Sequence, residues 1–138
     1  MKIKYDASLM QMMNTFSSIT KAELKDCFLD NRGSLVYVVK ESQLGKALGR
    51  NAQKVRSLER ATNRKIKIVE FNPDLIRFIR NFIYPLRAGR IDLEDKTVII
   101  EPSDLKTRGK LIGRAAQNLR EIEASVKRYF DIDEIKVM

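Results

Sequence analysis

The chain has 138 residues, with 27 lysines and arginines against 18 aspartates and glutamates, no histidine, no tryptophan and one cysteine. This length permits one ordinary domain or two small ones, and 43% apolar residues are typical of a globular protein. Without histidine there is no imidazole base, nucleophile pair or metal ligand, and one cysteine makes neither an internal disulfide nor a metal cluster. We therefore expect no enzymatic activity, no cofactor, no metal and no small-molecule substrate.

The apolar residues are too interrupted for a membrane protein. The longest unbroken apolar run, Leu35 to Val39, is far shorter than a membrane span. The first dozen residues lack the basic start, apolar stretch and small-residue cleavage site of a secretory signal. We expect a cytoplasmic protein that makes no contact with membranes and works as a monomer.

The net charge of +9 is unevenly distributed along the chain. Residues 46–67 carry +7, residues 106–128 carry +5 and residues 77–90 carry +4, which leaves −7 for the rest. Such patterning is typical of a surface that binds an anionic partner. The four arginines of the middle stretch are, by themselves, more typical of a solvated helix face than of a site.

Hydrophobic periodicity and turn residues predict the same six elements in each half of the chain. The first half is predicted to form a helix, two strands, two helices and a strand at 7–18, 27–29, 35–39, 41–48, 51–62 and 66–71. The second half is predicted to repeat this order at 73–84, 90–93, 97–101, 103–112, 115–129 and 135–137. Ser103 is the predicted N-cap of its helix. Cys27 and the three methionines at 10, 12 and 13 are predicted to pack in the first core.

This pattern predicts an α+β protein of two domains, 1–71 and 72–138. Each is expected to have the order α-β-β-α-α-β, with a three-stranded sheet covered by helices on one face. A shift of 64 residues supports the duplication, because it lays Gly45–Glu59 on Gly109–Glu123 with eight of 15 pairs identical.

The duplicated segment contains a junction between two helices, Gly49-Arg50-Asn51-Ala52 and again Gly113-Arg114-Ala115-Ala116. Glycine there lets the chain turn sharply and lets a nucleic-acid backbone approach closely. The N–H groups at the start of the next helix favour a phosphate, and the arginine of each junction can add a bidentate contact.

Neighbouring cations and polar residues complete the candidate site in each copy. In the first copy the predicted RNA-binding residues are Lys46, Gly49, Arg50, Asn51, Ala52, Gln53, Lys54 and Arg56. In the second copy they are Lys110, Gly113, Arg114, Ala115, Ala116, Gln117 and Arg120.

These junctions resemble the GxxG loop of the KH domain, which clamps about four nucleotides of single-stranded RNA, and the element order resembles the type II form of that domain. The segments around Cys27, Val38–Glu41, Gly45–Gly49, Arg56–Glu59 and Lys65–Glu70 are similar to the archaeal NusA-like transcription factors, which consist of two KH domains and little else. The resemblance covers essentially the whole chain. The bacterial relative carries an additional polymerase-binding domain and an S1 domain that we do not expect in this chain, so neither polymerase contact nor termination activity is carried over from it.

The last glycine of GxxG is replaced by Ala52 and Ala116. An alanine with positive φ would be strained, whereas an alanine already inside the following helix would favour it. Because both copies make the same choice, we expect these alanines to belong to the helix.

The resemblance implies a non-enzymatic protein that grips nascent single-stranded RNA during transcription elongation or termination. Two alternatives remain open. One is a KH protein associated with the ribosome or its assembly, and the other is a protein-interaction adaptor whose altered loops no longer bind RNA.

Overall fold

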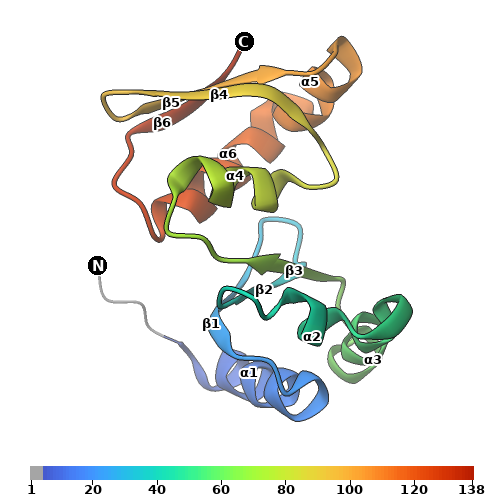
Figure 1. Cartoon of the computed structure of the whole chain (residues 1–138). Helices are drawn as coiled ribbons and strands as arrows, with labels where there is room; N and C mark the ends of the chain where they lie inside the picture. Colours follow the sequence, from blue (N-terminus) through green and yellow to red (C-terminus); the bar gives the residue numbers. More distant parts are fainter. Residues whose placement is uncertain (1–4) are drawn as a thin grey trace. The chain divides into compact units, whose positions relative to one another are not determined.

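The computed structural model describes residues 5–138 and divides into two compact units, one ending at Asn72 and the other beginning at Pro73 (Figure 1). The first unit contains α1 (Ala7–Thr20), β1 (Leu24–Leu29), β2 (Leu35–Val39), α2 (Leu44–Leu48), η1 (Arg50–Ala52), α3 (Gln53–Thr62) and β3 (Ile66–Glu70). The second contains α4 (Leu75–Ile83), β4 (Ala88–Glu94), β5 (Thr97–Pro102), α5 (Leu105–Ile112), η2 (Arg114–Ala116), α6 (Gln117–Lys127) and β6 (Glu134–Val137). The predicted α-β-β-α-α-β order is therefore confirmed in both units, with a short three-residue turn, η1 or η2, between the second and third helices.

Each unit contains one three-stranded sheet with the same topology. The sheet orders are β1-β2-β3 and β4-β5-β6, and in each the first pair is antiparallel and the second pair parallel. Two helices connect the middle strand of each sheet to the last strand. They return the chain to the end at which the middle strand began, so the last strand runs parallel to it. This is the predicted α+β arrangement of tandem type II KH domains.

The helices pack on the apolar side of each sheet. In the first unit Phe16 of α1 and Leu58 of α3 are fully buried with Tyr37 of β2, whose hydroxyl donates to the Met12 carbonyl at 2.8 Å. Burial raises the pKa of Tyr37 above its ordinary value. In the second unit Phe78 of α4 and Val126 of α6 are fully buried. These cores fix the helices on either side of each junction.

Of the residues predicted to pack in the first core, all but one do so. Cys27 is fully buried, as expected, and Met12 and Met13 pack against the first core. Met10, however, is 55% exposed. It lies about 100° around the helix from the centre of the stripe formed by Leu9, Met12, Met13 and Phe16, because the α-helix has about 3.6 residues per turn.

Two predicted helix starts are corrected by the structure. Helix α2 begins at Leu44 rather than at residue 41, since Ser42 has a φ of +69° and belongs to a turn. The N-cap of α5 is Asp104 rather than Ser103, because the Thr107 N–H donates to the Asp104 carboxylate at 2.7 Å. That bond stabilises the charged form and holds the pKa of Asp104 below its ordinary value.

Within residues 5–138, every helix is either too short or too polar to cross a membrane.

Candidate nucleic-acid interface

The first junction is a tight turn made almost entirely of left-handed backbone. Helix α2 ends at Leu48 and is capped by Gly49, which has a φ of +73°; after Arg50 the chain passes through Asn51 at +54° and Ala52 at +55°. Gln53 is the next residue with helical angles. The turn is closed by the Ala52 N–H, which donates to the Gly49 carbonyl at 3.3 Å.

The second junction repeats this backbone residue for residue. Gly113 has a φ of +73°, Ala115 of +53° and Ala116 of +58°. The expectation that Ala52 and Ala116 belong to the following helix is therefore wrong. Both alanines precede that helix in a conformation that costs an L-residue roughly 1–2 kcal/mol, and such strain is concentrated at functional sites in proteins.

Glycine is required at the first position of each turn for space as well as for its positive φ. A Cβ on Gly49 would lie 2.9 Å from Cγ of Lys54, and a Cβ on Gly113 would lie 2.9 Å from Cβ of Asn118. The two residues that press against these glycines occupy equivalent positions, 64 residues apart.

Lys54 and Asn118 brace the end of the preceding helix. The Lys54 ammonium donates to the carbonyls of Lys46 at 2.9 Å and Thr20 at 3.1 Å, which ties α3 to the ends of α2 and α1. The Asn118 amide donates to the carbonyls of Lys110 at 2.8 Å and Leu111 at 3.2 Å. The predicted site residue Lys54 therefore has a bracing contact that its sequence position does not reveal.

The two predicted arginines on the second helix also make internal contacts. The Arg56 guanidinium donates to the Asn51 carbonyl at 3.0 Å and so supports the first turn. Arg120 pairs with Glu123 at 3.4 Å, while Glu123 also accepts from the Ile135 N–H at 2.9 Å. Arg120 is thus held over α6 by a carboxylate that is fixed to β6.

The remaining cations of the two junctions are presented to solvent. The side chains of Lys46, Arg50, Lys110 and Arg114 lie on exposed residues, and none makes a hydrogen bond or ion pair to any other part of residues 5–138. Each pair consists of one lysine on the first helix and one arginine in the turn. An incoming phosphate can therefore bind them without displacing an internal partner.

The other predicted residues lie around the same turns. Asn51, Ala52, Gln53, Ala115 and Gln117 are exposed, whereas Gly49, Gly113 and Ala116 are partly buried. All fifteen predicted residues are thus gathered at the two junctions. No group of three or more potential metal ligands occurs in the described part of the chain.

A glycine also leaves the helix surface bare one turn before each junction. Gly45 and Gly109 lie inside helices, and a Cβ on either would meet no atom within 4 Å. Glycine inside a helix costs about 1 kcal/mol relative to alanine. Nothing within the fold requires this cost, and a bare backbone surface permits close approach of a ligand.

Asn118 is not among the residues predicted for the site. The alignment of the repeat could have identified it, because the alignment places Asn118 opposite Lys54 and so marks a position that serves both junctions.

The fold and the junction define two type II KH domains, each with its GxxG-type turn between the second and third helices. The sequence model of the KH domain matches residues 13–98, which is more than half of the chain. The protein belongs to the KH domain family.

Relatives that match over nearly the whole of this chain support the resemblance to the archaeal NusA-like proteins. The chain is 26% identical to "Probable transcription termination protein NusA" of Thermoplasma acidophilum, over 99% of this chain and 96% of the relative. It is 28% identical to the protein of that name from Methanococcus vannielii, over 100% of this chain and 81% of the relative. The crystal structure of APE1850 has the same fold, with a TM-score of 0.77 at 21% identity, covering 97% of this chain and all of that one.

Proposed function

We propose that this protein binds nascent single-stranded RNA through both turns, Gly49–Ala52 and Gly113–Ala116, and acts in transcription elongation or termination. The relatives that match nearly the whole chain are named as probable transcription termination proteins, and the KH domain is an RNA-binding fold. The protein would act as a monomeric binding module in the cytoplasm, without catalysis.

The observation that carries the RNA-binding part is the duplicated backbone. Three positive φ values occur in the same order in both turns, next to an exposed arginine that has no internal partner within residues 5–138. Strained turns are concentrated at functional sites, and two copies of a phosphate clamp read a longer strand than one.

The proposed contacts with each phosphate combine attraction by positive charge with a fixed position at the turn. Arg50 and Arg114 would each hold a phosphate, the lysines one turn earlier would add charge, and the first N–H groups of α3 and α6 would face the same anion. Contact with RNA polymerase is a further part of the proposal, since a factor that acts on nascent RNA works beside the enzyme.

Charge reversal at the two turn arginines tests the proposal. We expect the double variant Arg50→Asp and Arg114→Asp to lose binding of a 20-nucleotide single-stranded RNA in a filter-binding assay, while its thermal unfolding stays close to wild type because both side chains are exposed. For the wild-type protein, log affinity should fall with log salt by about 0.7 per phosphate contacted. Unchanged affinity in the folded double variant would refute RNA binding by these turns.

Crosslinking in cells tests the cellular role. Recovery of nascent transcripts together with RNA polymerase is expected, and recovery of ribosomal RNA alone would contradict the transcription assignment.

A further inference from the structure

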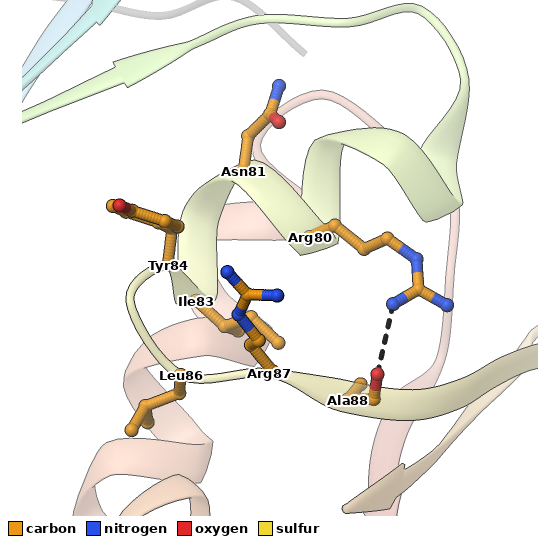
Figure 2. Close-up of a pocket in the computed structure, with 7 residues that line it drawn as sticks. All are labelled: Arg80, Asn81, Ile83, Tyr84, Leu86, Arg87 and Ala88. Carbon is orange, nitrogen blue, oxygen red and sulfur yellow. Dashed lines mark hydrogen bonds between the residues drawn. The ribbon is translucent and has the colours of Figure 1, made fainter. Parts of the chain in front are cut away.

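A separate basic pocket lies in the second unit, between the end of α4 and the start of β4. It has a volume of about 340 Å³ and is formed by one short stretch of chain, which contributes Arg80, Asn81, Ile83, Tyr84, Leu86, Arg87 and Ala88 (Figure 2). Pockets that bind small ligands begin near 300 Å³, which is enough for about one nucleotide. None of the junction residues described above lines it.

The pocket has a fixed cation and a free one. The Arg80 guanidinium donates to the Ala88 carbonyl at 3.1 Å, so it is held against the first residue of β4 (Figure 2). Arg87 is exposed and has no hydrogen bond or ion pair with the rest of residues 5–138. Both guanidinium groups turn toward the space between the helix and the strand (Figure 2).

No carboxylate offsets these charges. No acidic residue lines the pocket, and the chain contains none between Asp74 and Asp92. Asp92 itself is paired with Arg90 at 2.9 Å. The pocket is therefore suited to an anion.

The pocket lining also includes an exposed aromatic residue, Tyr84, whose ring points outward on the side away from Arg80 (Figure 2). Tyr84 is 70% exposed, which makes it the most exposed aromatic side chain of the described residues, although it directly follows the buried Ile83. An exposed ring on the same pocket lining as the free Arg87 is a combination that binds single-stranded nucleic acids, because the ring can stack on a base and arginine matches a phosphate. An acidic peptide would need the arginines but not the ring.

We propose that this pocket binds one nucleotide of single-stranded RNA, with Arg87 on the phosphate and Tyr84 stacked on the base. The inference rests on the proposed function and adds a contact outside the two turns.

The test compares matched variants of the full chain for binding of the same 20-nucleotide RNA. Arg87→Glu should weaken binding by roughly tenfold and lower the slope of log affinity against log salt by about 0.7. Arg77→Glu is the control, because it makes the same change of charge at an exposed position of α4 that does not line the pocket. Tyr84→Ala should also weaken binding by roughly tenfold, and Tyr84→Phe should bind like wild type because it keeps the ring.

The outcomes separate this inference from the proposed function. If the double turn variant loses RNA binding but Arg87→Glu behaves like Arg77→Glu, the pocket proposal fails and the proposed function stands. If Arg87→Glu weakens binding but the double turn variant does not, the pocket proposal stands and the proposed function fails. Should a hexaglutamate peptide bind and depend on Arg87 while RNA binding does not, the pocket would belong to an acidic protein segment and the inference would be overturned.

Discussion

At the scale of single residues, the most informative positions are the alanines that replace the last glycine of each turn. Ala52 and Ala116 have φ values of +55° and +58°. Both alanines therefore have a backbone conformation that glycine adopts without strain and that is strained for a residue with a Cβ. The chain keeps this cost at both turns, which indicates that the shape of the turn matters more than its local stability.

Restoring the glycines should therefore stabilise the fold. We expect Ala52→Gly and Ala116→Gly each to raise the free energy of unfolding by roughly 1 kcal/mol, because the left-handed penalty is removed. The matched controls are Ala61→Gly and Ala124→Gly, on exposed helical positions, which should lower it by about 1 kcal/mol. Chemical denaturation measures both, and equal destabilisation by all four changes would show that the turns are not strained.

At the scale of elements, the brace between the helices of each junction differs between the two units. In the first unit a charged side chain, Lys54, bonds the carbonyls at the ends of α1 and α2. In the second unit a neutral amide, Asn118, bonds only the end of α5. The first junction is thus tied to one more helix than the second.

Removing the Lys54 ammonium should loosen the first unit. We expect Lys54→Met to lower the free energy of unfolding by about 1–2 kcal/mol, because two helix-end carbonyls lose a charged donor. Lys54→Asn should lose less, since an amide serves the equivalent position of the second unit. Arg50→Met, which removes a charge without removing an internal bond, is the control for thermal unfolding. A Lys54→Met protein as stable as wild type would refute the brace.

The sequence predicted which elements form, because apolar residues recur at helical or strand spacing in each of them. It did not predict the left-handed alanines, because alanine favours a helix wherever its neighbours allow one, and the turn is imposed by glycine, by the following helix and by the cores on both sides. It also placed Lys54 with the free cations, because a pattern of charges does not show which ammonium already has an internal acceptor.

At the scale of the whole molecule, the net charge of +9 combines basic junctions with an acidic remainder. The four junction cations without an internal partner, Lys46, Arg50, Lys110 and Arg114, divide evenly between the two turns, and both turns have the same backbone. One strand that engages both turns binds the second intramolecularly, so its affinity exceeds that of either turn alone.

Length dependence of RNA binding checks this expectation. For a 20-nucleotide RNA, Arg50→Asp or Arg114→Asp alone should weaken binding by roughly a hundredfold. An RNA of about four nucleotides, which fills one turn, should lose no more than a fewfold to either change, because the other turn still binds it. A wild-type protein that binds both RNAs equally well would show that the turns do not act together.

The most direct test of RNA binding by the turns is a nuclear magnetic resonance titration of the ¹⁵N-labelled protein with a short single-stranded RNA. The account predicts that the amide signals of residues 49–53 and 113–117 shift the most, and that these shifts disappear in the double variant Arg50→Asp and Arg114→Asp. Saturable binding that leaves the amides of both turns unmoved would contradict it.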